Sequence, residues 1–312
     1  MENKRTSTCS VIISTYNGAL YLIQQLDSIR NQSTIPDEVI IRDDNSNDDT
    51  VKVLREYIDT YGLNWKLVVE GENKGYYRSF IDLAYLSSSD LVFFCDQDDI
   101  WETDKIEVIL DFFETHSDAL AVSCNIQCID KENAPIRNHQ YFNVSTVSSI
   151  GLGSILYTSN ILGCTLGFKR SLLEMIDRTS LKADQGSHDT LISMLAACKN
   201  GLYKIPYVGV NYRIHGNNNS MKSDLSRKER IFKIYNYYND LVEAIMPECD
   251  GERKSLGILK DVLVLQKQRL QFFDEKSISQ IIGCLRKYCV YAGNIGRGIK
   301  LFCADIYYCY KK

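Results

Sequence analysis

Three aspartates fall within the four residues Asp96-Gln97-Asp98-Asp99, directly after the apolar run LVFFC. Carboxylates this close repel one another, so placing them at a strand end costs stability unless a cation neutralises them. Oxygen ligands of this kind suit Mg²⁺ or Mn²⁺, which keep open positions for phosphate oxygens. An isolated pair of aspartates would indicate a solvated turn before a helix. The position of these three aspartates after a buried strand instead favours binding of a divalent metal and a phosphorylated substrate.

Three further polar segments follow apolar runs in the same way, and they are Ser14–Gly18, Asp43–Thr50 and Glu70–Arg78. Asp44 could accept a hydrogen bond from the imide N–H of uracil or thymine while Asp43 holds the loop. Tyr16 could stack on a base, and Thr15 could contact base or ribose. Each segment alone could be a turn or a helix cap. Their equivalent positions predict a shared nucleotide site.

The elements that must position these segments alternate along the first half of the chain. Buried strands are expected at Cys9–Ser14, Glu38–Asp43, Trp65–Glu70 and Leu91–Cys95, and helices at Leu20–Ile29, Thr50–Tyr57, Ser79–Leu86 and Lys105–Phe113. This alternation predicts an α/β fold, with a mostly parallel sheet covered by helices on both faces. In such sheets ligands bind beyond the carboxyl ends of the strands, where the polar segments fall.

The pattern changes after residue 119. We expect a strand at Ala119–Ile129, a polar irregular loop at Lys131–Ser159, helices at Arg170–Ile176 and Asp189–Lys199, and one or two strands at Leu202–Tyr212. Beyond residue 221 the expected helices are Lys228–Ile245, Arg253–Phe273, Ser277–Tyr291 and Ile299–Tyr310. The chain therefore divides into a nucleotide-sugar-binding catalytic domain at 1–221 and a basic helical region at 222–312.

Composition excludes some classes of function. The chain has 312 residues and a net charge of −4, which gives no support to nucleic-acid binding by bulk electrostatics. Its 11 cysteines show no metal-type spacing, and we expect them to be reduced and mostly buried. The first residues do not resemble a signal peptide, and no apolar run approaches the roughly 20 residues of a spanning helix. We therefore expect a cytoplasmic protein.

The motifs V-x-I-S-T-Y-N-G, D-D-x-S-x-D-x-T and D-x-D-D-x-W together identify a resemblance, because their order and spacing are similar to those of family-2 glycosyltransferases with the GT-A fold. The form DQDDIW resembles the bacterial rhamnosyltransferase-like branch. The resemblance covers about residues 8–220. It implies an inverting, metal-dependent transfer of a sugar, L-rhamnose from dTDP-rhamnose, to a glycan or a polyprenyl-diphosphate-linked acceptor in surface polysaccharide synthesis. A UDP-hexose donor is the alternative.

The resemblance also implies roles for particular residues. Those expected to bind the nucleotide are Thr15, Tyr16, Asn17, Asp44, Asn73, Gly75, Arg78, Asp96, Gln97 and Arg213. The donor sugar or the acceptor is expected to contact Asp99, Trp101, Gly163 and His188. The expected metal ligands are Asp98 and His215, and the metal is Mg²⁺ or Mn²⁺.

The candidate catalytic base is Asp189, in Ser187-His188-Asp189, where the family has a carboxylate before a helix. It would take the proton from the attacking hydroxyl. His188 stands where the family commonly has glutamate. The related branch continues with aromatic residues, whereas this chain has Thr190 and Leu191, and the acceptor is therefore left open. Capping of the next helix is the alternative role of Asp189.

The end of the chain mixes basic with aromatic and aliphatic residues. Residues 284–312 carry Arg286, Lys287, Arg297, Lys300, Lys311 and Lys312 against one acid, Asp305. This composition suits an interfacial helix on the anionic inner face of a membrane. Packing on the catalytic domain and a homodimer interface are equally good interpretations.

Other classes of protein fit the sequence less well. A dinucleotide-dependent oxidoreductase needs G-x-G-x-x-G after the first strand, where this chain has S-T-Y-N-G. A sugar-1-phosphate nucleotidyltransferase has a basic glycine-rich loop there. A glycoside hydrolase uses two carboxylates and needs no nucleotide. A catalytically inactive nucleotide-sugar-binding protein is the alternative outside enzymes, and the joint presence of the expected metal ligands and base argues against it.

Overall fold

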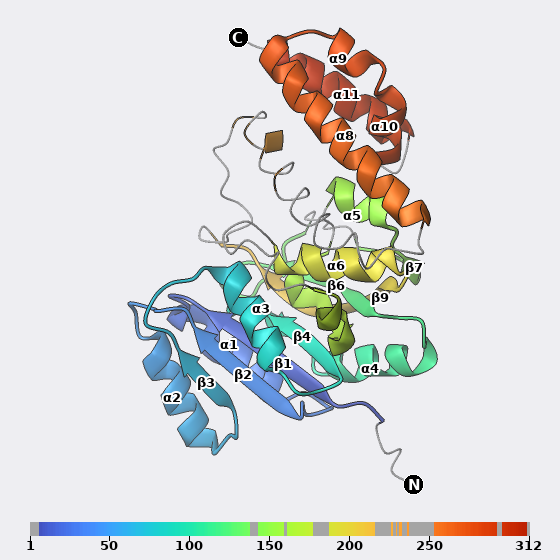
Figure 1. Cartoon of the computed structure of the whole chain (residues 1–312). Coiled ribbons are helices and arrows are strands. Elements are labelled where there is room, and N and C mark those ends of the chain that lie inside the picture. The colour runs from blue at the N-terminus through green and yellow to red at the C-terminus, as the bar shows by residue number, and fades with distance from the viewer. Residues whose placement is uncertain are drawn as a thin grey trace.

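The computed structural model describes residues 6–137, 143–158, 161–176, 187–215, 226, 229, 231–232, 236, 253–291 and 295–310. Its centre is one mixed sheet (Figure 1) with the strand order β3-β2-β1-β4-β8-β6-β9-β5 and a short strand, β7, paired to β9. The strands are β1 (Cys9–Thr15), β2 (Glu38–Asp43), β3 (Lys66–Val69), β4 (Leu91–Cys95), β5 (Ile100–Trp101), β6 (Ala121–Ile129), β7 (Ser148–Ser149), β8 (Leu166–Lys169) and β9 (Leu202–Arg213).

The first four strands pair in parallel, as their alternation with helices predicts. In this register Thr15 lies opposite Asp43, and Ile13 lies opposite Cys95. The polar segments that follow β1, β2 and β4 therefore leave the sheet at one edge. The strands of the second half are less regular, because β8 runs antiparallel to both β4 and β6, whereas β9 pairs in parallel with β6.

Helices cover both faces of the sheet (Figure 1). Successive side chains of a strand point to opposite faces, so Val11 and Ile13 pack with α1 (Ala19–Arg30), α2 (Thr50–Tyr61) and α4 (Lys105–Thr115). Ile12 between them packs in the core that includes α3 (Tyr76–Leu86) and α6 (His188–Cys198). The predicted α/β fold class, with helices on both faces, is confirmed.

Two segments differ from what the sequence led us to expect. The predicted irregular loop Lys131–Ser159 contains a helix, α5 (Leu152–Thr158), and part of it lies outside the described residues. Leu152 and Ile155 bury their side chains against α6 and the C-terminal helices, which explains why this short segment is helical. The segment Arg170–Met175 forms a 3-10 helix rather than an α-helix.

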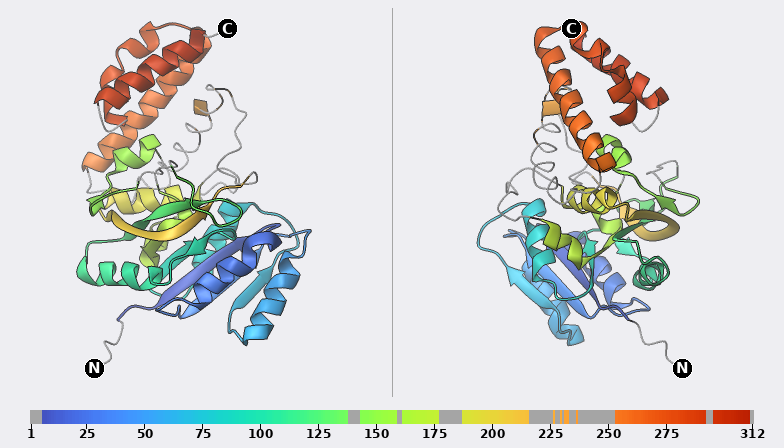
Figure 2. Two further views of the ribbon diagram at one scale, coloured as in Figure 1. Left: turned by 180° about the vertical axis from the view of Figure 1, so that it is seen from behind. Right: turned by 45° about the vertical axis from the view of Figure 1, so that its right-hand side comes forward.

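The C-terminal helices are α8 (Arg253–Glu275), α9 (Ser279–Ile282), α10 (Leu285–Tyr291) and α11 (Ile295–Tyr310), and α5 lies between them and α6 (Figure 2). The expected helix Lys228–Ile245 lies largely outside the described residues. Between α8 and α11, Arg269 donates Nε and Nη2 to the buried Asp305 carboxylate at 2.6 and 3.0 Å, and the Tyr288 hydroxyl donates to the same group at 2.8 Å. Among the described helices, none combines the length and apolarity needed to span a bilayer.

Candidate active site

The loop after β2 is held by Asp43, which is fully buried. Its carboxylate accepts hydrogen bonds from the Ser46 N–H at 2.9 Å, the Ser46 hydroxyl at 2.6 Å and the Thr15 hydroxyl at 3.0 Å. These bonds tie the ends of β1 and β2 together. Thr15 is therefore buried beneath the site, and its predicted contact with base or ribose stays a prediction.

Asp44, the candidate reader of the base, lies beside the loop after β3. It is 2% exposed, and its two oxygens accept from the N–H groups of Lys74 and Gly75 at 2.9 and 2.8 Å. A carboxylate oxygen has a second lone pair, so each can accept one more hydrogen bond. Gly75 has φ 81°, a left-handed value that suits glycine, and the Asn73 side chain caps its N–H. Asp44, Asn73 and Gly75 thus form one unit.

Gln97 joins the acidic loop to the loop after β1. Its side-chain oxygen accepts from the Tyr16 N–H at 2.8 Å, and its side-chain nitrogen donates to the Tyr16 carbonyl at 3.1 Å. A Cβ atom at Gly18 would lie 2.1 Å from that oxygen, so glycine is required for the approach. Asn17, at φ 48°, completes the turn by accepting from the Asn47 N–H. This clamp leaves the Tyr16 side chain half exposed, as a base-stacking residue would need to be.

The two predicted metal ligands lie next to each other, although 117 residues separate them in the chain. His215 Nε2 is 2.8 Å from Asp98 Oδ2, and both side chains are partly exposed. A carboxylate oxygen and an imidazole nitrogen converging on one accessible point fit a divalent cation. The donor types suit such a cation, and the assignment of Asp98 and His215 as metal ligands stays a prediction.

Arg213, predicted to bind the diphosphate, is fully buried. Its guanidinium donates to the carbonyls of Asp98 and Asp130 at 2.7 and 3.1 Å and to the side chain of Asn133 at 2.6 Å. The backbone N–H of Arg213 donates to the Asp99 carboxylate at 3.0 Å. These contacts show Arg213 supporting the acidic loop from beneath, and a contact with the diphosphate stays a prediction.

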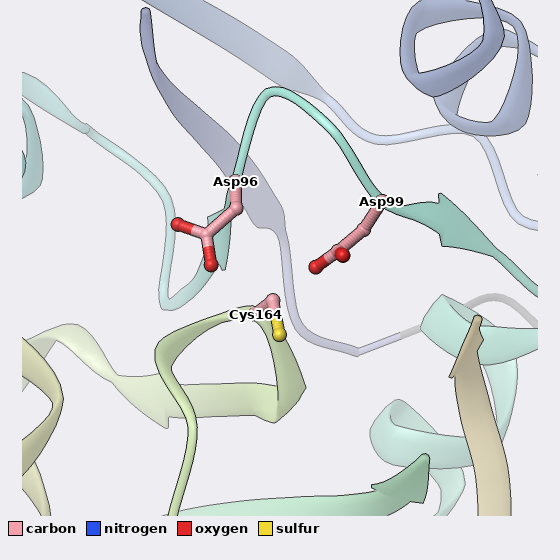
Figure 3. Close-up of side chains that lie close together, drawn as sticks. All are labelled: Asp96, Asp99 and Cys164. Carbon is pink, nitrogen blue, oxygen red and sulfur yellow. The ribbon is translucent and has the colours of Figure 1, made fainter. Parts of the chain in front are cut away.

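Asp96 and Asp99 stand at the two ends of the acidic loop, and Cys164 lies opposite them on the 3-10 turn Gly163–Thr165 (Figure 3). One ligand atom from each of the three lies within 4.8 Å of the others. Burial, followed by the charges of Asp98 and Asp189, raises the pKa of Asp96 to about 7. Burial raises the pKa of Asp99 well above its usual value, with Asp98 and Asp96 adding to the effect. Positive charge near this loop would therefore favour the ionised form of its carboxylates.

The candidate base, Asp189, lies in the first turn of α6, next to the turn Gly163–Thr165. It accepts from the Ser187 hydroxyl, from the Thr190 N–H at 2.6 Å and from the Gly163 N–H. Burial raises its pKa to about 6, although these hydrogen bonds oppose the shift. Its charge also raises the pKa of Asp96, which places the two carboxylates in one site. A carboxylate with a pKa near neutrality suits general-base chemistry.

His188 is 5% exposed, and its ring stacks on Phe80 with centroids 4.0 Å apart. Neither ring nitrogen has a hydrogen-bond partner within the described part of the chain. Burial lowers its pKa to about 3, so the imidazole is neutral. A Cβ atom at Gly163 would lie 2.6 Å from His188 Nε2, so only glycine allows this approach. The two predicted sugar-contacting positions, Gly163 and His188, are thus packed against each other.

Two predicted site residues make contacts within the protein, and one residue that the sequence did not single out lies near the site. Trp101 is 3% exposed and packs against Phe93, so its expected contact with a sugar stays a prediction. Arg78 pairs with Asp82 on its own helix at 3.1 Å, and a nucleotide contact stays a prediction there as well. Tyr76, which the sequence did not single out, is 48% exposed, and burial followed by the charges of Asp189 and Asp96 raises its pKa. Its place after the N-x-G segment was the available signal.

The architecture is a GT-A fold, in which loops at the carboxyl edge of the sheet carry the acidic loop, His215 and the partly exposed carboxylate of Asp189. TarS 1-349 from S. aureus, solved in complex with UDP-GlcNAc, shares this fold with a TM-score of 0.64 at 17% identity, over 97% of this chain and 89% of TarS 1-349. Residues 10–176 match the model of "Glycosyl transferase family 2". The chain belongs to this family.

Three relatives show how far the similarity extends. Chondroitin synthase of Escherichia coli is 26% identical over 240 residues, which are 75% of this chain and 33% of that protein. An uncharacterised glycosyltransferase of Nostoc sp. is 27% identical over 234 residues, 71% of this chain and 69% of that protein. The dTDP-rhamnosyl transferase RfbG of Shigella flexneri is 34% identical over 104 residues, 32% of this chain and 36% of that protein. The alignment thus spans only about a third of the chondroitin synthase.

Proposed function

We propose that this protein transfers a sugar from a nucleoside-diphosphate donor to a hydroxyl group of a glycan or lipid-linked acceptor, with inversion, in the synthesis of a bacterial surface polysaccharide. The observation that carries the proposal is the position of Asp189. It is a carboxylate with a pKa of about 6, in one site with the acidic loop that holds Asp98 next to His215. Family membership supports the transferase class.

Each group has a defined part in this reaction. Asp189 takes the proton from the attacking hydroxyl, since it precedes a helix where the family has its catalytic carboxylate and its pKa of about 6 suits a base near neutral pH. Asp98 and His215 would hold a divalent cation, which would neutralise the charge that grows on the leaving diphosphate. Arg213 holds the acidic loop through the Asp98 carbonyl. The half-exposed Tyr16 and the carboxylate of Asp44 offer a stacking surface and a hydrogen-bond acceptor to the base.

The proposed donor is dTDP-rhamnose, and a UDP-hexose is the alternative. The DQDDIW motif and the partial similarity to the dTDP-rhamnosyl transferase RfbG support the first. The shared fold with TarS, solved with UDP-GlcNAc, leaves the second open. Thymine and uracil present the same imide N–H, so Asp44 does not distinguish them.

A thermal-shift screen of dTDP, UDP, GDP and their common sugars, with and without Mn²⁺ or Mg²⁺, tests the proposal. We expect metal-dependent stabilisation by dTDP or UDP species, because ligands that bind the folded state raise its stability. Asp98→Ala should abolish this stabilisation, whereas Asp111→Ala, at an exposed position on α4, should leave it intact. If no nucleotide stabilises the protein under any condition, an inactive binding protein replaces the transferase as the better explanation. A preference for UDP-hexoses would exclude dTDP-rhamnose as the donor.

The helical region at 222–312 is proposed to attach the catalytic domain, 1–221, to an anionic membrane surface. Ile282 and Ile295 are 64% and 71% exposed, and the cations Arg286, Arg297 and Lys300 are exposed near them in the sequence. Basic and apolar groups presented together bind anionic lipid interfaces. This position would bring a lipid-linked acceptor to the site.

Cosedimentation with phosphatidylglycerol vesicles at low salt measures this attachment. Wild-type protein should sediment with them and stay in solution with neutral phosphatidylcholine vesicles. Replacing Arg286, Arg297 and Lys300 by glutamine should release it. Equal sedimentation of that triple variant, or none of the wild type, would contradict membrane attachment and favour a dimer interface or packing on the catalytic domain.

A further inference from the structure

Lys105, the first residue of α4, carries its charge inside the protein. Its side chain is 0% exposed. Its Nζ donates to the carbonyl of Cys164 at 2.6 Å and lies 3.2 Å from the centre of the Trp101 ring. A buried ammonium has lost its hydration and destabilises the folded protein unless other groups compensate for that loss. The carbonyl and the aromatic face each compensate part of that cost.

The remaining compensation comes from the acidic loop. Lys105 binds the backbone of Cys164, and the side chain of Cys164 faces Asp96 and Asp99 (Figure 3). The bond to the Cys164 carbonyl and the approach of the Cys164 sulfur to the two carboxylates place the ammonium close to the acidic loop. Burial still lowers the pKa of Lys105 as a whole. The ammonium and the carboxylates therefore interact across the core.

We propose that Lys105 is a positioning residue that also acts electrostatically, as an internal cation that partly neutralises the acidic loop and so sets how strongly that loop attracts a divalent cation. This inference rests on the proposed function, because it concerns the cation held by Asp98 and His215. Through its bond to the Cys164 carbonyl, Lys105 also holds the turn Gly163–Thr165, whose Gly163 N–H reaches Asp189.

The two roles of Lys105 predict opposite changes when its charge is removed. Loss of the internal cation leaves the loop more negative, which tightens the binding of an external cation. Loss of the bond to Cys164 loosens the turn that carries the Gly163 contact to Asp189, which slows catalysis. A residue with a merely structural part would weaken metal binding and activity together. The direction of the change in metal affinity therefore separates the two explanations.

The experiment is a Mn²⁺ titration of the full chain followed by electron paramagnetic resonance, which counts free Mn²⁺ without requiring turnover. Lys105→Met should lower the dissociation constant for Mn²⁺ by about threefold to tenfold, the order expected when one unit charge is removed at a distance where protein and solvent screen most of its effect. Lys105→Gln, which keeps a donor for the Cys164 carbonyl and removes the charge, should do the same with a smaller loss of kcat. Lys105→Gln still tests the loss of the charge if Lys105→Met does not fold.

Lys204→Met is the matched control. Lys204 is also buried, and burial lowers its pKa. Cys124 and Cys164 act on Lys204 as they do on Lys105, but Asp99 of the acidic loop acts on Lys105 alone of the two. Its replacement should leave the Mn²⁺ dissociation constant unchanged. Unchanged or weaker Mn²⁺ binding in both Lys105 variants would overturn the inference while leaving the metal site in place. Absence of Mn²⁺ binding by the wild type, with or without nucleotide, would overturn the metal site and this inference with it.

Discussion

Asp189→Asn should lower kcat by about a hundredfold to ten-thousandfold, the usual contribution of a general base. Asparagine has nearly the same shape, and its oxygen can still accept from the N–H groups of Thr190 and Gly163. The fold and the nucleotide site should therefore remain intact. The measurement is the transfer rate at saturating donor and metal, together with the dissociation constant of the nucleotide.

Asp111→Asn, at an exposed position on the same protein, is the control and should transfer at the wild-type rate. The base assignment would be wrong if Asp189→Asn kept more than about a tenth of the wild-type kcat, far above what loss of a general base leaves. It would also be wrong if nucleotide affinity fell in proportion to kcat, because that result would give Asp189 the capping role instead.

The rate of transfer should fall below about pH 6. Asp189 must be ionised to accept a proton, and burial raises its pKa to about 6, so the active fraction decreases tenfold per pH unit below that value. An ordinary aspartate, with a pKa near 3.9, would keep nearly full activity down to about pH 5 and about half of it at pH 4. A profile of kcat between about pH 4 and 8 at saturating substrates distinguishes the two.

A fall in rate near pH 6, here called the acidic limb of the profile, most often reflects a histidine, so His188 needs a control. Burial lowers its pKa to about 3, and His188→Gln should therefore leave the limb where it is, whatever it does to the rate. Within the described part of the chain, the charge of Asp189 also acts on two titratable groups, Tyr76 and Asp96. Asp96 is proposed to bind the nucleotide, so its protonation should lower kcat/KM more than kcat. Loss of the limb in His188→Gln would contradict the assignment to Asp189.

Local periodicity in the sequence was enough to predict the parallel half of the sheet. The strand Glu38–Asp43 and the strand Leu91–Cys95 have the predicted bounds, because continuous apolar runs end there at charged residues. Parallel pairing then places the segments after them at one edge, which is why the sequence alone could assign Asp43 and Asp96 to one site. The pairing of Asp98 with His215 came from family resemblance, since no local pattern links them.

The missed elements are short and owe their form to distant partners. Strand β8, Leu166–Lys169, has only four residues and includes Gly167, too few to show a period of two. It exists because β4 and β6 flank it. The buried Lys105 was missed for a related reason, because a lysine at a helix start looks solvated in sequence. Only the packing of Trp101 and the turn at Cys164 places it in the core.

Gln97 bridges both backbone polar groups of Tyr16 and so ties the acidic loop to the loop after β1. Whatever orders the loop of Gln97 also orders the loop of Tyr16, and the reverse holds. If a metal and a nucleotide bind these two loops, thermodynamic linkage requires their effects to be reciprocal. The nucleotide must then raise the affinity for the metal by the same factor as the metal raises the affinity for the nucleotide. A single amide side chain, fitted over Gly18, would thereby make the two ligands cooperative.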